Sequence, residues 1–322
     1  MTLKRKIATI FGGTGFVGRH IVKRLAAEGY TIKVATRIPE RANFLKTSGV
    51  VGQIVPFLCD YRDPASLREA IEGADVVVNC VAIRFQRGKN KFKRLHAELP
   101  GQIAEACARE NVSRFVHISA LGVDKSKSQY ARTKLEGEHA VLAACPWATI
   151  VRPSVIFGPE DEFFNLFARL SVMAPVLPLI GGGKTKFQPV YVGDVAHAAM
   201  AAILLPALGD VDPRGKIYEL GGPEVVSFRE IYDLIARFTE RKRALVSVPF
   251  CLMKIKAFFL GMLPNPLITP DQVESLKTDN VVSDNALTLS ALGIVPTGMG
   301  LVLPGYLETY RAGGRFADKK TA

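Results

Sequence analysis

The sequence predicts an α/β protein with a doubly wound parallel sheet of the Rossmann type and a smaller, irregular C-terminal lobe. Two observations predict it: short β-branched runs alternate with helical patterns through the first half, and a glycine-rich turn follows the first run. Strands that alternate with helices form βαβ units, whose parallel sheet is covered on both faces. A chain of 322 residues is long enough for one large core or two unequal ones.

The expected strands are the runs rich in valine, isoleucine and threonine. They span residues 7–11, 31–36, 51–58, 75–82, 114–119 and 149–157. Helical periodicity predicts the connecting helices at residues 16–28, 64–72, 103–110 and 130–144. Gly29 suits the end of the first helix, and Pro64 suits the first turn of the second.

After Gly158 this rhythm breaks, because prolines and the triple glycine 181–183 mark long connections. Helical patterns remain at residues 161–173, 195–205 and 227–239, and the last opens with the capping-box spacing Ser227 to Glu230. We therefore predict a Rossmann domain over residues 1–158, with a further sheet contribution from about 185–222. Residues 159–322 form the expected smaller lobe, for substrate or partner docking.

Composition narrows the classes of partner. Lys and Arg number 42 against 30 Asp and Glu, and this basic surplus favours acidic partners in general. The five cysteines stand singly and the histidines have no ligand spacing, so we predict no metal site and a reducing compartment. No apolar run reaches the roughly 20 residues that a spanning helix needs.

The strongest motif is Gly12-Gly13-Thr14-Gly15-Phe16-Val17-Gly18, at the junction of the first strand and the first helix. In such a loop one glycine makes the tight turn, one lets the backbone approach a diphosphate, and one packs helix against strand. The helix N-terminus then offers free N–H groups and a positive dipole to the phosphates. This context predicts dinucleotide binding rather than a purely structural turn.

The end of the second strand distinguishes NADP(H) from NAD(H). A carboxylate there would bind the ribose hydroxyls, but the strand ends in Arg37, and no acid follows before Glu40. Arg37 can hold a 2′-phosphate, although a solvated arginine is the plain alternative, so NADP(H) is favoured. Asp60, after the third strand, either accepts from the adenine amino group or caps the turn before Pro64.

Tyr130 and Lys134 form a YxxxK pattern that places both side chains on one face of a helix. A nearby ammonium favours the phenolate, so we expect Lys134 to lower the pKa of Tyr130. Such a tyrosine serves as a general acid or base beside a carbonyl or hydroxyl. Ser119, at the end of the fifth strand, is the candidate that orients the substrate oxygen.

Together with residues 152–159, these motifs resemble the short-chain dehydrogenase/reductase superfamily, on its extended or atypical side. Residues 11–16, 153–158, 188–195 and 268–274 most resemble one branch, the nucleotide-binding accessory subunits of respiratory complex I and their bacterial homologues. The resemblance implies NADPH with a structural role, close to the quinone site and the membrane arm. It implies a place on the cytoplasmic face of a bacterial inner membrane, or on the matrix side in mitochondria, with complex I subunits or the membrane surface as partners.

The resemblance also assigns cofactor contacts by position. The matching residues are Gly12, Thr14, Gly15, Phe16, Val17, Gly18, Arg37, Asp60, Val81, Ala82, Ser119, Tyr130, Lys134, Pro153 and Val155. In this alignment Arg37 faces the 2′-phosphate and Lys134 bonds the nicotinamide ribose. Active members usually place Ser or Thr where this chain has Ala120, one residue beyond Ser119. This departure weakens a turnover role and leaves binding intact.

Two surface segments stay open in interpretation. Residues 84–94 contain six basic residues and no acid, which fits a solvated loop or docking to an acidic protein or anionic lipid. No nucleic-acid motif accompanies them, so no nucleic-acid partner is expected. The apolar segment 250–263 is too short to span a bilayer; a core helix is slightly favoured over an interfacial or partner-docking helix.

Three functions compete. The leading one is a nucleotide-binding, non-catalytic or weakly catalytic subunit that stabilises a respiratory membrane complex. The alternative is a soluble, cytoplasmic NADPH-dependent reductase, dehydrogenase or epimerase that uses Tyr130, Lys134 and Ser119 on a small carbonyl or hydroxyl substrate. The third is an NADP-sensing regulator without chemistry.

Overall fold

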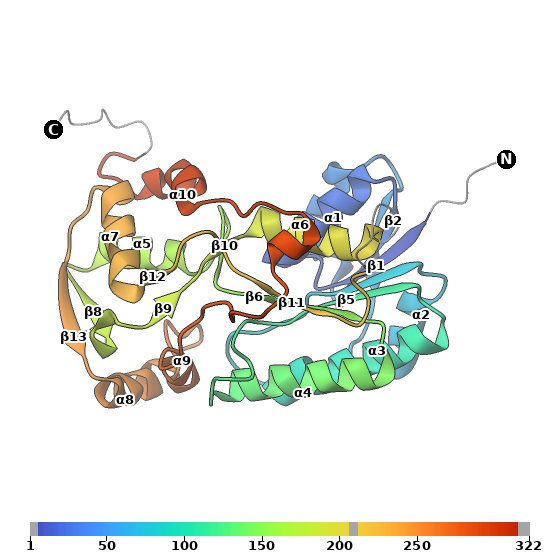
Figure 1. Cartoon of the computed structure of the whole chain (residues 1–322), viewed down its shortest axis with the longest axis horizontal. Coiled ribbons are helices and arrows are strands. Elements are labelled where there is room, and N and C mark those ends of the chain that lie inside the picture. The colour runs from blue at the N-terminus through green and yellow to red at the C-terminus, as the bar shows by residue number, and fades with distance from the viewer. Residues whose placement is uncertain (1–5, 206–211, 315–322) are drawn as a thin grey trace.

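A seven-stranded parallel sheet forms the centre of the molecule (Figure 1). The computed structural model describes residues 6–205 and 212–314. The strand order is β11-β6-β5-β4-β1-β2-β3, and every neighbouring pair is parallel. The strands are β1 (Ile7–Phe11), β2 (Thr31–Thr36), β3 (Ile54–Leu58), β4 (Val76–Asn79), β5 (Arg114–Ile118), β6 (Thr149–Pro153) and β11 (Ile217–Leu220). The predicted fold class is confirmed.

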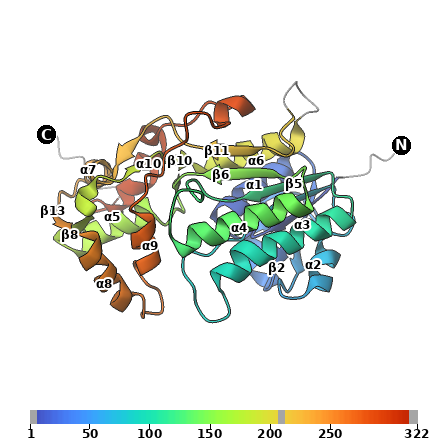
Figure 2. The same ribbon diagram turned by 60° about the horizontal axis from the view of Figure 1, so that its bottom comes forward.

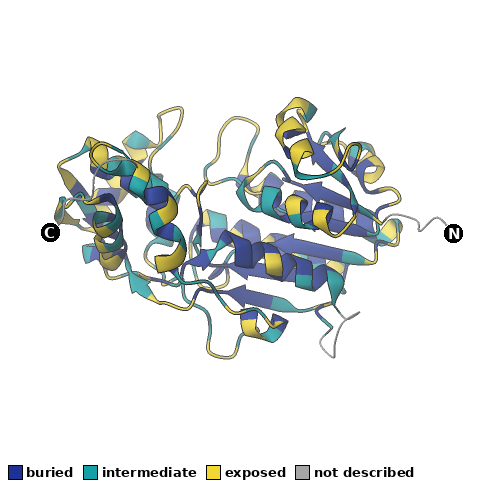
Figure 3. Ribbon diagram, turned by 90° about the horizontal axis from the view of Figure 1, so that it is seen from above, coloured by how far each residue is buried: buried dark blue, intermediate teal, exposed yellow. Residues whose placement is uncertain are grey.

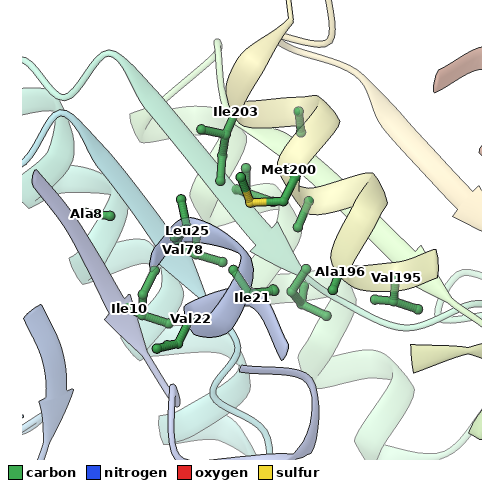
Figure 4. Close-up of a cluster of buried hydrophobic side chains, with 14 of the residues drawn as sticks. Ala8, Ile10, Ile21, Val22, Leu25, Val78, Val195, Ala196, Met200 and Ile203 are labelled. Carbon is green, nitrogen blue, oxygen red and sulfur yellow. The ribbon is translucent and has the colours of Figure 1, made fainter. Parts of the chain in front are cut away.

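Helices cover both faces of this sheet. One face packs on α1 (Phe16–Ala27) and α6 (Val192–Leu204), whose apolar residues interlock with the strands (Figure 4). The other face packs on α2 (Pro64–Ile71), α3 (Leu99–Arg109) and α4 (Gln129–Ala144), and α3 and α4 lie side by side in Figure 2. Side chains alternate across each strand, so Ile10 enters the first core and Phe11 the second.

The expected strand 149–157 is interrupted in the structure. It divides into β6 and β7 (Ile156–Phe157), and β7 leaves the main sheet to pair with β10 (Val190–Tyr191). At the break, the Ser154 hydroxyl and the Val155 N–H both donate to the side-chain oxygen of Asn280. Two further elements of the first half of the chain were not predicted: the 3₁₀ segment η1 (Pro39–Ser48) and the π-helical turn η2 (Lys93–Glu98) that leads into α3.

The second lobe has its own core, formed by apolar residues of its helices and short strands. Its helices are α5 (Phe164–Met173), α7 (Phe228–Thr239), α8 (Phe250–Leu260), α9 (Pro270–Ser275) and α10 (Met299–Leu307). Its short 3₁₀ turns are η3 (Gly181–Gly183) and η5 (Glu308–Tyr310). The turn η4 (Leu289–Leu292) instead packs on α6 and β11, in the core of the main sheet. Its strands form two small pairs, β8 (Val176–Ile180) with β13 (Ala244–Val248) and β9 (Lys186–Phe187) with β12 (Val226–Ser227). The predicted capping box of α7 is present: Ser227 and Glu230 bond each other's backbone N–H.

A buried ion pair fastens α4 to the sheet. Arg152 of β6 donates from Nη2 to Oε2 of Glu138 on α4 at 2.7 Å, and both side chains are buried. Glu219 of β11 lies 3.6 Å from the same guanidinium. Because a broken buried pair leaves an uncompensated charge, this contact fixes the position of α4 and of the candidate residues on it.

The interpretation of residues 250–263 as a core helix was wrong. Of the α8 side chains only Met253 and Ala257 are buried, because α8 lies at the outer edge of the second lobe (Figure 1).

Figure 3 shows the contrast between the buried sheet and the exposed outer helix faces. None of the helices within residues 6–205 and 212–314 is long and apolar enough to cross a membrane.

Candidate cofactor-binding site

The glycine loop turns tightly between β1 and α1. Gly12 has a φ of +75°, which favours glycine, and a Cβ there would lie 2.9 Å from the carbonyl carbon of Cys80. The Gly15 N–H donates to the Gly12 carbonyl at 3.0 Å and closes the turn. Gly12 is therefore the glycine that makes the tight turn, directly against the end of β4.

Gly18 is required by close packing. A Cβ at this buried position would lie 2.3 Å from the Gly12 carbonyl oxygen and 2.7 Å from the Gly13 Cα. The first turn of α1 thus rests on the loop backbone itself. Gly15, the N-cap residue, is exposed, no side chain caps it, and no acid lies in the first turn. The N-terminal N–H groups of α1 are therefore available to an anion at the surface.

Arg19 is a residue of this site that the sequence did not single out. Its guanidinium donates to the carbonyls of Gly15 and Thr14, each at 3.3 Å, and lies over the ring of Phe44. It places a cation beside the loop, one helical turn after Gly15. Glycine-loop motifs do not include this position, and the four-residue spacing from Gly15 was its only signal.

Arg37 follows β2 and is exposed, as expected for a side chain that meets a ligand from solvent. Its Nη1 donates to the side-chain oxygen of Asn90 at 3.1 Å, and its guanidinium lies 5.8 Å from the centre of the Tyr61 ring. These two contacts orient the cation at the rim of the glycine loop. Asn90 comes from the basic loop 84–94, which thereby borders the candidate site.

Asp60 is held by its neighbour. Both of its carboxylate oxygens accept from the Arg62 guanidinium, at 3.0 and 3.1 Å, and these bonds lower the pKa of Asp60. The alternative that Asp60 caps the turn before Pro64 is confirmed, because its carboxylate also accepts the Arg62 backbone N–H at 3.0 Å and its carbonyl accepts the Asp63 N–H. The helix that follows is capped by Asp63, which accepts from the Ala65 N–H. An adenine contact by Asp60 stays a prediction and requires Arg62 to share the carboxylate.

The end of β4 lies against the loop. Val81 is buried, and its N–H donates to the side-chain oxygen of Asn79 at 3.0 Å. Ala82 is exposed beside it. Since Gly12 packs on the backbone of Cys80 and Val81, both predicted ribose neighbours follow directly after the strand that touches the glycine loop.

Lys134 is almost fully buried on α4. Its Nζ donates to the Ile118 carbonyl at 3.0 Å, at the end of β5 and next to Ser119. Burial lowers the pKa of Lys134 to about 8. The hydroxyl of Ser119 is also buried and has no hydrogen-bond partner in the described part of the chain. A buried polar atom without a partner is costly, so this corner suits a ligand with hydroxyl or amide groups.

The pKa of Tyr130 is shifted in the direction opposite to the one we expected. Burial raises its pKa to about 12, whereas we expected Lys134 to lower it. The Tyr130 ring packs edge-on against His96 and Phe92. No hydrogen bond within residues 6–205 and 212–314 joins the side chains of Tyr130, Lys134 and Ser119. The removal of the phenol from water therefore outweighs the ammonium nearby.

Two buried histidines, unassigned by sequence, surround this corner. His96 accepts the Ile83 N–H at Nε2, so it is neutral and carries its proton on Nδ1. His117 accepts from Asn79, which leaves its buried Nε2 unpartnered in the described part of the chain. Burial is the main cause that lowers the pKa of both rings, and the charge of Lys134 adds to it. Both therefore stay uncharged beside Lys134.

The second lobe reaches this corner through Asp271 and Asn280. Asp271 of α9 accepts the N–H groups of Gln129 and Tyr130, at 2.6 and 3.0 Å, and so caps α4 beside the candidate tyrosine. Asn280 bonds the Val155 N–H and the Leu121 carbonyl. Sequence reasoning missed both roles, because each contact joins residues more than 120 positions apart.

Pro153, the last residue of β6, is buried, and Val155 lies half-buried two residues later. The Pro153 carbonyl accepts the Leu121 N–H at 2.8 Å. Phe16 of the glycine loop packs against Gly158. A Cβ placed on Gly158 would lie 3.3 Å from Cζ of the Phe16 ring. The structure therefore gathers the predicted cofactor residues along the ends of β1, β2, β4, β5 and β6, the edge where doubly wound sheets bind their ligands.

Replacing Gly18 by alanine tests the packing of the loop. The added methyl group collides with the Gly12 carbonyl, so α1 must shift, and we expect dinucleotide affinity to fall by about tenfold or more. Isothermal titration measures it. Gly300→Ala is the control, because nothing lies within 4 Å of its Cβ. Equal affinity of Gly18→Ala and the unmodified protein would contradict the role assigned to the loop.

Replacing Lys134 by methionine tests its buried charge. The folded-state pKa of about 8 lies below the usual 10.5, so the unfolded chain binds more protons between these values. As the pH rises from about 8 to 10.5, the free energy of unfolding of the unmodified protein should therefore increase relative to that of Lys134→Met. Urea titrations measure it, with the exposed Lys23→Met as control. A difference that stays constant or moves the other way contradicts the assignment.

The model of the NAD dependent epimerase/dehydratase family matches residues 8–221. Among solved structures, the fold recurs in an NADPH-dependent quinone oxidoreductase of Escherichia coli, complexed with NADPH. The two chains superpose with a TM-score of 0.72 and 19% sequence identity, and the match covers 93% of this chain and 98% of the other. It also recurs in MoeE5 in complex with UDP-glucose and NAD, with a TM-score of 0.69 and 18% identity over 94% of this chain and 97% of the other.

Curated relatives are more similar in sequence. Subunit 9 of the NADH dehydrogenase (ubiquinone) 1 alpha subcomplex of Arabidopsis thaliana is 37% identical over 96% of this chain and 79% of its own length. The NADH-ubiquinone oxidoreductase 40 kDa subunit of Neurospora crassa is 33% identical over 95% of this chain and 80% of its own. The predicted resemblance to this branch is confirmed, and the chain belongs to the NAD dependent epimerase/dehydratase family.

Proposed function

We propose that this protein is an NADP(H)-binding accessory subunit of a respiratory NADH:quinone oxidoreductase, with a stabilising role. The observation that carries the proposal is the near full-length similarity to complex I subunits from a plant and a fungus, together with a glycine loop in binding geometry. Gly12, Gly15 and Gly18 shape the cradle for the diphosphate, and Arg37 stands at its rim for the 2′-phosphate.

The residues that would face the nicotinamide, around Ser119, Tyr130 and Lys134, favour binding of the cofactor over catalysis. NADPH supplies a hydride where a substrate carbonyl lies beside it. In this chain Ala120 stands where active members carry Ser or Thr, and the raised pKa of Tyr130 makes its proton harder to release. Lys134 and the Ser119 hydroxyl, which has no hydrogen-bond partner among the described residues, would bond ribose and amide groups.

The names of the same relatives, which place those proteins in mitochondria, support a proposal about partners and location. We propose that the chain associates peripherally with other subunits of the complex. It would do so on the cytoplasmic face of a bacterial inner membrane, or on the matrix side of a mitochondrial one.

Reversing the charge of Arg37 tests the choice of cofactor. Arg37→Asp should weaken NADPH binding at least about tenfold more than NADH binding, because only NADPH carries the 2′-phosphate that a guanidinium can bond. Isothermal titration with each dinucleotide gives the ratio. Arg41→Asp, an equally exposed arginine four residues on, is the control. Equal losses for both dinucleotides would show that the site does not select NADP(H).

Association with the complex is tested in native membranes. In a mild detergent, native gels probed for this chain should show it in the band that carries NADH dehydrogenase activity. A strong detergent, which dissociates peripheral subunits, serves as the control. Migration only as a free monomer in the mild detergent contradicts the proposed function, whatever the cofactor titrations give.

A further inference from the structure

The structure brings together the two surface segments that sequence reasoning left open. Nη1 of Arg87, in the basic loop 84–94, donates to the carbonyl of Pro264 at 2.9 Å across 177 positions of sequence. Pro264 lies in the turn that follows α8. In Figure 2 α8 and the teal loop before α3 reach the same lower edge of the molecule. The apolar helix and the basic loop are therefore parts of one surface.

Helix α8 presents large apolar side chains to solvent on this surface. Their exposed fractions are 53% for Leu252, 58% for Ile255, 56% for Phe258 and 64% for Phe259. At 100° per residue these four fall within an arc of about 120° that points away from the buried Met253 and Ala257. The arc continues into the following turn, where Met262 and Leu263 are also exposed. Such an apolar patch on the surface marks an interaction site.

The charges that the two segments themselves carry are all basic. Residues 244–269 and 84–97 contain no Asp or Glu. Lys254 and Lys256 flank the arc, one on each side, and Lys254 also pairs with Glu274 at 3.3 Å. In the basic loop, Arg84 pairs with Glu162. The exposed Lys89, Lys91 and Lys93 and the flanking Lys256 have no ion pair within residues 6–205 and 212–314.

We propose that α8 and the basic loop 84–94 form a docking surface for a bilayer that carries anionic headgroups. α8 has 11 residues and is about 16 Å long, about half the thickness of a hydrocarbon core, so it would lie flat in the interface. Its phenylalanine and aliphatic side chains enter the boundary between headgroups and acyl chains, while the lysines extend to the phosphates. The loop lysines add long-range attraction to the surface.

Charge and composition favour a bilayer over a protein partner. Protein interfaces surround their apolar centre with a rim of donors and acceptors of both signs. Here both residues of α8 that flank the apolar arc are lysines. Lys254 pairs with Glu274 of α9, but Lys256 has no ion pair within the described residues, and the exposed residues of the arc are large and flexible or aromatic. This inference goes beyond the proposed function, because it requires neither a bound cofactor nor other subunits.

Vesicle flotation of the full chain tests the proposal. We expect binding to phosphatidylcholine vesicles that contain phosphatidylglycerol, weak binding to pure phosphatidylcholine, and loss of binding as salt screens the charges. Phe259→Glu should reduce binding at least about tenfold, because a charge in the apolar arc resists burial. Val51→Glu, at a fully exposed valine between η1 and β3, is the matched control and should bind like the unmodified protein.

A second pair of variants tests the loop. Lys89→Glu with Lys91→Glu should reduce binding by about fivefold or more for each lysine, since each basic residue near an anionic surface contributes about that factor. Lys23→Glu on α1 is the control. Circular dichroism of every variant establishes that the fold is intact. NADPH titration is the further control for Phe259→Glu and not for the loop variants, because Lys89 and Lys91 flank Asn90, which holds Arg37.

Three outcomes would overturn the proposal. Equal binding to neutral and anionic vesicles would remove the charge recognition, and no binding to either would remove the surface itself. A dimer in light scattering that Phe259→Glu dissociates would show that a second copy covers α8. Each outcome leaves NADPH affinity and migration with the complex unchanged, so it is distinguishable from failure of the proposed function.

Discussion

The contact between the first turn of α1 and the backbone of the glycine loop sets the geometry on which the site depends. Gly18 lies so close to the Gly12 carbonyl that no side chain fits between them. This packing aims the N-terminal N–H groups of α1 at the ends of the neighbouring strands. Because no side chain caps them and the first turn of α1 contains no acid, a diphosphate is the ligand that they suit.

The other end of the site is built around a buried cation. Lys134 lies against the Ile118 carbonyl, between two neutral histidines, and its own burial opposes its charge. The same dry surroundings hold Tyr130 in its protonated form. A corner of this kind presents a buried ammonium and a buried hydroxyl to ribose and amide groups.

The sequence predicted what depends on local pattern. Period-two and helical runs placed most strands and helices, and the glycine spacing located the loop, because these features follow from neighbouring residues. It did not predict the break after β6, the caps supplied by Asp271 or the bonds of Asn280, because these depend on residues far along the chain. The interpretation of α8 as a core helix was wrong because its apolar residues lie on several sides of the helix, so the sequence does not reveal which side packs against the protein.

The central claim is that main-chain N–H groups at the start of α1 bind the diphosphate of NADPH. A crystal structure with NADPH tests it most directly. The account predicts diphosphate oxygens within hydrogen-bonding distance of the amides that follow Gly12, with the 2′-phosphate beside Arg37. A dinucleotide bound elsewhere on the chain, or a loop that stays empty at saturating NADPH, would contradict it.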